Sequence, residues 1–307
     1  MPALKKTSIG GQALIEGVMM RGPQKSAMAV RLPDGSIDTE VWETKPLTAW
    51  YQRTPLVRGV FNFVESLRVG YRCLSKSIDK TMPEEEPTSK FEKFLEEKLG
   101  DRLTGIITGA GVVLGLILAI FLFLFLPSGI IKLLEPVLHL PWLMTILEAA
   151  IKIAIFVLYL WAISAMPDIR RMFQYHGAEH KTIACYEAGL ELTVENIRGQ
   201  SRFHPRCGTS FILIVLIISA LIFSMVSWDS LVLRVGLKLL LLPVVMGISY
   251  ELLKLAGRYT NVLTKILSAP GLWLQRLSTR EPDDSQIQVA IASMEPAIPD
   301  DPECDRW

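Results

Sequence analysis

The sequence lacks several features that mark common protein classes. It has only four cysteines in 307 residues and no CxxC pair, which excludes a disulfide framework and leaves the thiols free to act as ligands or nucleophiles. Its 32 Lys and Arg nearly balance its 31 Asp and Glu, so bulk charge gives no support to nucleic-acid binding, and no nucleic-acid partner is expected. The glycine-rich stretch at residues 10–23 matches neither GxGxxG nor a P-loop.

Apolar residues, by contrast, are abundant: half of the chain is hydrophobic, only 21% is charged, and the mean hydropathy is +0.34. Residues 103–126 contain no charge and are long enough, at about 1.5 Å per residue, to cross a hydrocarbon core of roughly 30 Å. Three further apolar runs cover residues 142–166, 211–227 and 231–253, the last two joined by a turn at residues 228–230. We therefore predict a mainly α-helical membrane protein with four transmembrane helices in the lipid bilayer.

Basic residues in the short connections predict the orientation of these helices. The connection at residues 127–141 contains only Lys132, whereas residues 167–208 contain six basic side chains. These six are Arg170, Arg171, Lys181, Arg198, Arg202 and Arg206. Both termini and the loop between the second and third helices are therefore expected on the cytoplasmic side.

One acidic residue interrupts the second apolar run, and a charge inside a membrane needs a partner. Glu148 lies at a depth that matches Lys238 in the fourth run, so we expect Glu148 to pair with Lys238 or Arg234 across helices. An intrahelical pair of Glu148 with Lys152, at i,i+4 spacing, is the alternative.

The soluble parts divide into segments with different patterns. Residues 1–56 are predicted to form a small β-rich cytoplasmic unit, with a hairpin at residues 26–42 around a Pro-Asp-Gly turn. Residues 57–102 are predicted to hold an amphipathic helix, a linker and a short charged helix; the amphipathic helix either docks on the β-unit, making it α+β, or lies on the inner leaflet. Transmembrane helices one and two are predicted at residues 103–166, a cytoplasmic loop at 167–208, and helices three and four at 209–256. Residues 257–307 are predicted to form a cytoplasmic helix and an acidic tail, which is disordered after about Thr279.

The candidate site lies in the loop at residues 167–208, where His176 and His180 form an HxxEH pattern around Glu179. Pro167 suits a first helical turn and Gly189 a C-terminal cap, so the segment is predicted to be helical. Residues four apart on a helix lie on one face, where two imidazoles can share a metal ion and a neighbouring carboxylate can act as a base. This order of residues is the one described for inverzincins.

A second pair of donors, His204 and Cys207, ends the same loop with HxxC spacing. Together with His176 and His180 they are predicted to form a metal site, and such donors favour zinc among divalent metals. Glu187 lies too far along the helix from His180 to bind the same ion, and is expected to orient a ligand or act on a substrate. Histidines that only fill polar positions, with buried thiols, are the alternative.

Two long motifs, GGQALIEGVMMRGP near the N-terminus and the stretch from HGAEH to HPRCGTSF, resemble the YqhQ family. This is a largely uncharacterised bacterial family of multi-pass membrane proteins, described as predicted metal-dependent enzymes. The resemblance implies a location in the bacterial plasma membrane and a metal suggestion that falls on His176, His180, His204 and Cys207, with Glu179 and Glu187 nearby. It implies no substrate.

Two functions remain open at this point. The first is a membrane-bound, metal-dependent hydrolase in which Glu179 is the general base and Glu187 supports it. The second is a non-catalytic assembly or partner-binding protein whose metal is structural, with a membrane-protein partner or a second copy of the chain. The absence of a midplane polar pathway or an inverted repeat argues against transport.

Overall fold

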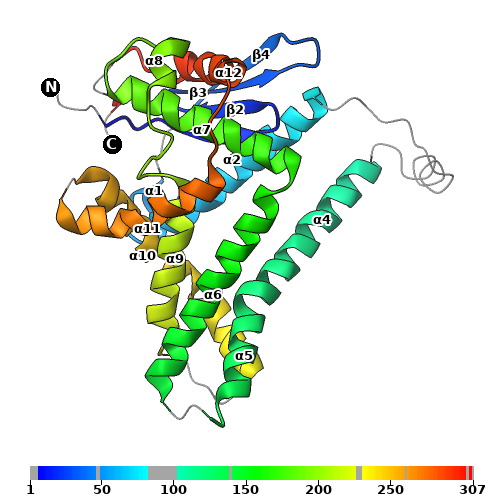
Figure 1. Ribbon diagram of the computed structural model, residues 1–307, viewed down its shortest axis with the longest axis vertical. Coiled ribbons are helices and arrows are strands. Elements are labelled where there is room, and N and C mark those ends of the chain that lie inside the picture. The colour runs from blue at the N-terminus through cyan, green and yellow to red at the C-terminus, as the bar shows by residue number, and fades with distance from the viewer. Residues whose placement is uncertain are drawn as a thin grey trace. The chain divides into compact units, whose positions relative to one another are not determined.

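The computed structural model describes residues 6–45, 49–81, 102–137, 140–225, 230–259, 261–301 and 304–305 (Figure 1). The chain forms two compact units. Unit 1 combines Met1–Thr81, Val157–Ser219 and Leu242–Trp307, and unit 2 combines Met82–Phe156 and Ala220–Leu241. Segments far apart in the sequence therefore build unit 1, which holds the candidate site. The predicted linker at residues 81–90 and the charged helix after it lie outside the described residues, apart from Thr81.

Unit 1 is built on a four-stranded antiparallel sheet in the order β1-β2-β3-β4. Its strands are β1 (Gly10–Leu14), β2 (Gly17–Arg21), β3 (Lys25–Arg31) and β4 (Ile37–Glu43). The predicted hairpin is confirmed, since β3 pairs with β4 from Lys25↔Glu43 to Arg31↔Ile37. Its turn uses Gly35 at a φ of 87°, which glycine adopts without steric cost.

Both faces of the sheet are covered, because side chains alternate along each strand. On one face Val18, Met20 and Ala29 pack against α7 (Pro167–Glu187) and α12 (Asp284–Met294). On the other face Met19, Met28 and Val30 form a cluster with Cys73 of α2 (Val57–Thr81). The sheet is thus the middle layer between α2 and the α7–α12 pair.

The predicted amphipathic helix is α2. Of the two alternatives for this helix, docking on the β-unit is the one that the structure shows. The most buried residues of its contact face are small, namely Gly70, Cys73 and Ser77, with Val69 and Leu74 partly buried beside them. Gly70 lies directly against the side chain of Gln12. Near its C-terminus Lys80 forms ion pairs with Asp38 and Glu40 of β4. Small buried residues let the helix approach the sheet closely, while other apolar residues of α2, such as Leu67, remain exposed.

The prediction of a disordered tail after Thr279 is wrong. Asp283 caps α12 by accepting a hydrogen bond from the backbone of Gln286, and Ile287, Val289 and Met294 are at most 1% exposed. Composition misled the prediction because this short helix lies between segments rich in proline and acidic residues. Its few apolar residues fill the centre of the unit 1 core.

Close packing between α7 and the segment before α12 depends on Gly177. A Cβ at this position would lie 2.0 Å from the backbone oxygen of Arg280, a contact that requires the backbone to move. We expect Gly177→Ala to lower the stability of unit 1 by about 1–3 kcal/mol. Gly236→Ala is the control, because a Cβ at position 236 in α10 (Leu231–Arg258) meets no atom within 4 Å. Thermal unfolding in detergent would contradict the expectation if both variants unfolded at the wild-type temperature.

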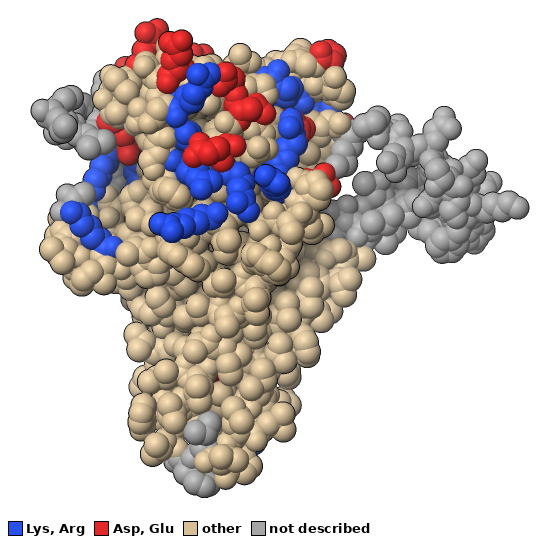
Figure 2. Space-filling model, in the orientation of Figure 1, with Lys and Arg blue, Asp and Glu red and all other residues tan. Residues whose placement is uncertain are grey.

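Three helical runs are long and apolar enough to cross a membrane: Gly109–Leu134, Trp142–Ser164 and Leu231–Arg258. The first combines α4 (Arg102–Ile120), the π-helix η1 (Phe121–Phe125) and α5 (Leu126–Leu134), and the second lies in α6 (Pro141–Ser164). Helix α9 (Gly208–Phe223) is apolar but has only 16 residues. On the face shown in Figure 2 the long helices are almost free of charged side chains, as a lipid-facing surface requires. The chain is thus a membrane protein whose described residues include three helices of spanning length, and a fourth crossing stays a prediction.

The connections between the apolar helices differ in part from the prediction. The expected loop at residues 127–141 begins as helix, because α5 continues to Leu134 with Pro127 at its first turn, where a proline is tolerated. The predicted turn at residues 228–230 lies outside the described residues, apart from Ser230.

The charges predicted to meet inside the membrane region do so within unit 2. Glu148 accepts hydrogen bonds from Arg234 at 2.9 Å and from Lys238, which confirms the interhelical pairing. Lys152 also lies 3.0 Å from the same carboxylate, so the intrahelical alternative is present as well. Ser128 of α5 donates to Glu148 at 3.0 Å. Because these four charged side chains are 0–4% exposed, one carboxylate holds three buried cations together.

Candidate metal centre

Two imidazoles of the candidate site stand one turn apart on α7, as the HxxEH spacing predicted. Pro167 begins the helix, and Gly189 follows its end with a φ of 68°. The rings of His176 and His180 lie with their centroids 4.4 Å apart. The local sequence therefore places two nitrogen donors on the same side of one helix.

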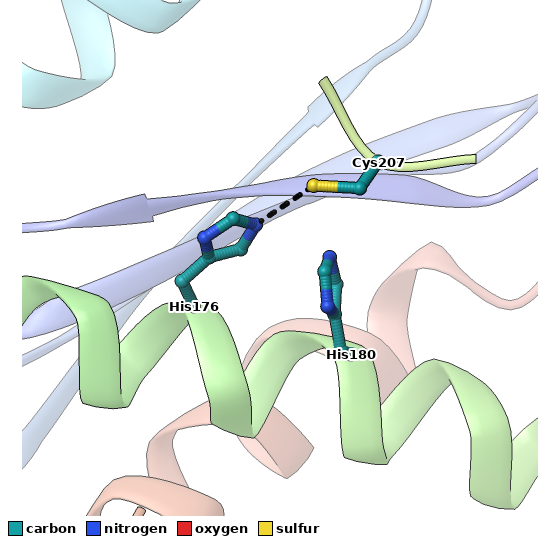
Figure 3. Close-up of side chains that lie close together, drawn as sticks. All are labelled: His176, His180 and Cys207. Atoms are coloured by element: carbon teal, nitrogen blue, oxygen red, sulfur yellow. Dashed lines mark hydrogen bonds between the residues drawn. The ribbon is translucent and has the colours of Figure 1, made fainter. Parts of the chain in front are cut away.

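The third donor, Cys207, comes from the loop that precedes α9. Its Sγ lies 3.3 Å from Nε2 of His176 and is also contacted by the hydroxyl of Thr209 at 3.2 Å. One ligand atom each of His176, His180 and Cys207 lies within 4.8 Å of the other two. In Figure 3 both rings point from α7 toward the sulfur of Cys207.

The remaining ring nitrogens are fixed by backbone carbonyls. Nδ1 of His176 donates to the oxygen of Ser278 at 2.8 Å, and Nδ1 of His180 donates to the oxygen of Arg202 at 2.7 Å. A carbonyl oxygen can only accept, so each Nδ1 carries a proton and each Nε2 is left for another partner. Metal-binding histidines are usually oriented in this way, and the two imidazoles and the thiol form a donor set that could bind a metal ion.

Electrostatics favour a negative charge on the sulfur. Burial alone would raise the pKa of Cys207, but attraction to His176 and His180 holds it well below its usual value. Burial alone would lower the pKa of His176, yet the charge of Cys207 raises it to about 9. Together the two shifts favour a thiolate on Cys207 beside an imidazolium on His176. A cation that binds between them takes the place of the shared proton.

Glu179 lies beside these donors with one carboxylate oxygen unused. The side chain is 5% exposed, and its Oε2 has no hydrogen-bond partner among the described residues. The backbone N–H of Gly11 interacts with the carboxylate, and burial raises the pKa of Glu179 despite the two histidines. A buried oxygen without a protein partner is available to a water molecule or a ligand.

The approach of Gly11 to Glu179 explains part of the glycine-rich N-terminal motif. A Cβ at Gly11 would lie 2.8 Å from Cγ of Glu179 and 2.7 Å from the backbone oxygen of Met19. Strand β1 therefore comes close to α7 only because this residue has no side chain. Glycine at this position thus has a packing role, which the absence of a GxGxxG or P-loop pattern left open.

His204 and Glu187 lie next to the three donors in a separate network. The ring of His204 lies 5.6 Å from that of His180, but its Nε2 faces Glu187 Oε2 at 3.5 Å. Glu187 also accepts hydrogen bonds from Arg206 and from the backbone of Thr7 at 2.9 Å. The structure thus brings all six predicted site residues into one region, but only three donors converge.

Helix α11 (Val262–Ser278) contributes residues that the sequence analysis missed. The side-chain amide of Gln275 accepts a hydrogen bond from the backbone N–H of His204 at 2.8 Å and donates one to the backbone carbonyl of the same residue at 2.7 Å. Ser278, at the end of the helix, supplies the carbonyl that orients His176. These contacts join segments about 70 to 100 residues apart in the sequence, and no local pattern signals them.

Comparison with known proteins places the chain in a family. A family model described as "Protein of unknown function (DUF1385)" matches residues 54–300. A protein of Bacillus subtilis (strain 168) named "Uncharacterized protein YqhQ" is 38% identical over 289 residues, which cover 92% of this chain and 90% of the relative. No solved structure shows a significant match. The chain therefore belongs to the YqhQ family, as its two long motifs indicated.

Proposed function

We propose that His176, His180 and Cys207 bind one divalent metal ion, with zinc the best fit, and that the protein is a membrane-bound hydrolase. The observation that carries the metal proposal is the orientation of the imidazoles: both Nδ1 atoms are held by carbonyls, while both Nε2 atoms face one thiol. A bound divalent ion would supply Lewis-acid chemistry at this position.

Glu179 is the general base in this proposal. It lies one residue before His180, its Oε2 is free of protein partners among the described residues, and its raised pKa brings proton transfer nearer to neutral pH. Glu187 is held by Arg206, Thr7 and His204, so it supports the position of His204 and does not exchange protons with a substrate. His204 would then support the metal ligands from outside rather than bind the ion.

A structural metal site in a non-catalytic assembly or partner-binding protein is the second candidate. Burial favours it, because His180 is 2% exposed and Cys207 is 5% exposed, which restricts the access of a substrate. In that case the ion would pin the loop before α9 onto α7, and Glu179 would only balance charge. The two candidates share the metal and differ in the role of Glu179.

The proposed orientation of the chain in the membrane rests on the basic residues between positions 167 and 208. The six Lys and Arg side chains between residues 167 and 208 support a location of unit 1 on the cytoplasmic side of a bacterial plasma membrane. Four crossings would bring both termini to this side, with α9 as the short third crossing.

Glu179→Gln distinguishes the two candidates. We expect the variant to bind zinc as the wild type does but to lose hydrolytic turnover by about 100-fold or more, since it removes only the base. The assay would use detergent-purified full-length protein with a quenched-fluorescence peptide library and a chromogenic acyl ester, and elemental analysis of the same samples. Glu195→Gln is the matched control, because Glu195 is exposed in the first turn of α8 (Val194–Arg198), outside the site, and this variant should keep full turnover.

Equal turnover in wild type and Glu179→Gln would contradict the hydrolase. Zinc bound to a wild type that cleaves neither probe would favour the structural candidate.

A further inference from the structure

Helix α11 is inverted relative to an ordinary surface helix. Its residues buried against the protein are mostly polar or small, and its largest apolar residues face outward. The buried set is Thr264, Ser268, Gly271, Leu274, Gln275 and Ser278. A surface helix of a soluble protein shows the opposite arrangement, with an apolar stripe inside and polar residues outside.

The inward face of α11 is fixed by specific polar contacts. Gln275 holds both backbone groups of His204 and donates to the hydroxyl of Ser210 at 3.2 Å. A Cβ at Gly271 would lie 2.3 Å from Oγ of Ser210, so α11 and α9 meet at close range. In Figure 1, α11 runs crosswise to α9. The helix therefore could not turn its apolar face inward without breaking these contacts.

The outward face is apolar along the length of α11. Val262, Leu263, Ile266 and Trp273 are between 53% and 74% exposed. At about 100° per residue these four positions fall on one side of the helix. Exposing such a continuous apolar stripe to water would be energetically unfavourable. We therefore expect lipid or another protein surface to cover it.

Two observations indicate what covers this stripe. Helix α10, one of the helices of spanning length, ends at Arg258, and α11 begins four residues later at Val262. In addition, residues 252–280 contain no Asp or Glu but five basic residues. These are Lys254, Arg258, Lys265, Arg276 and Arg280. Basic residues beside an apolar face favour an interface with anionic lipid.

We propose that α11 is an interfacial membrane helix, with Val262, Leu263, Ile266 and Trp273 inserted among the lipid acyl chains at the membrane face where α10 ends. Lys265 and Arg276, the two basic residues of α11, are exposed and then lie at the level of the phosphate groups. The opposite face of the same helix holds His204 and His176. The candidate metal centre is therefore separated from the lipid by about the width of one helix. The proposal on α11 does not depend on whether the centre binds a metal.

Quenching by brominated lipids tests this proposal on the full-length protein. The background would be Cys304→Ser, which removes the one cysteine exposed among the four, since Cys73, Cys185 and Cys207 are buried. Leu263→Cys and Ile266→Cys would each be labelled with bimane and reconstituted in phosphatidylcholine–phosphatidylglycerol vesicles. Val41→Cys on β4 is the matched control, because Val41 is an apolar residue 49% exposed in the same unit.

We expect bimane at positions 263 and 266 to emit at shorter wavelength than at position 41. Brominated acyl chains should quench it several-fold, while iodide in the buffer should quench only the control. Quenching by iodide alone would overturn the proposal, because the face would then contact water. Quenching by neither agent would also overturn it, since the purified vesicles contain no other protein and a second copy would then cover the face. Val262→Cys repeats the test if either variant loses the wild-type circular dichroism spectrum.

Discussion

Glu148→Gln is expected to destabilise unit 2 by about 3–5 kcal/mol, because it removes the one carboxylate among the described residues of a buried cluster of charges. Arg234, Lys152 and Lys238 all contact this carboxylate, and none of them is more than 4% exposed. Glutamine keeps the shape of the side chain but not its charge. The cations would then be left to repel one another in a medium of low dielectric constant.

Glu135→Gln is the control for this change. Glu135 pairs with Lys132 at 2.6 Å, but both side chains are 39% exposed, so the loss is expected to be at most about 1 kcal/mol. Unfolding of the purified variants in detergent, followed by helical circular dichroism over a denaturant series, measures both. Equal small losses would show that water or lipid headgroups reach the cluster.

His176→Ala is expected to abolish tight zinc binding, whereas His204→Ala is expected to retain it. The first substitution removes one of three converging donors and leaves two. The second removes a ring whose Nε2 faces Glu187, so it should weaken binding by about 10–100-fold, as expected for a residue that supports a ligand from outside. Competition with a chromogenic zinc chelator measures the affinity of each purified variant.

Equal loss in the two variants would contradict this division of roles. It would instead support the four-donor set that the HxxC spacing of His204 and Cys207 predicted.

Local patterns predicted the parts of the fold that local rules determine. Alternation around Gly35 predicted the β3–β4 hairpin, and the spacing of His176 and His180 predicted their common face on α7. Matching depth within the apolar runs predicted the meeting of Glu148 with its cations. In each case the prediction used a single rule: strand alternation, helical spacing, or the need of a charge inside the membrane for a partner.

Other features depend on contacts between distant segments, and the sequence did not predict them. The acidic tail after Thr279 forms α12 because the sheet offers its few apolar residues a core. The orientation of His176 depends on the carbonyl of Ser278, 102 residues away. The inverted faces of α11 follow from the contact of Gln275 with His204, which no composition or period reveals.

X-ray absorption at the zinc edge of the purified, zinc-loaded protein tests the metal centre most directly. The expected shell contains one sulfur at about 2.3 Å and at least two imidazole nitrogens at about 2.0–2.1 Å, at one zinc per chain. The sulfur should disappear from the shell in Cys207→Ser. A shell of oxygen atoms alone, or a protein that binds no stoichiometric metal, would contradict the proposal and leave His176 and Cys207 as a buried thiolate–imidazolium pair.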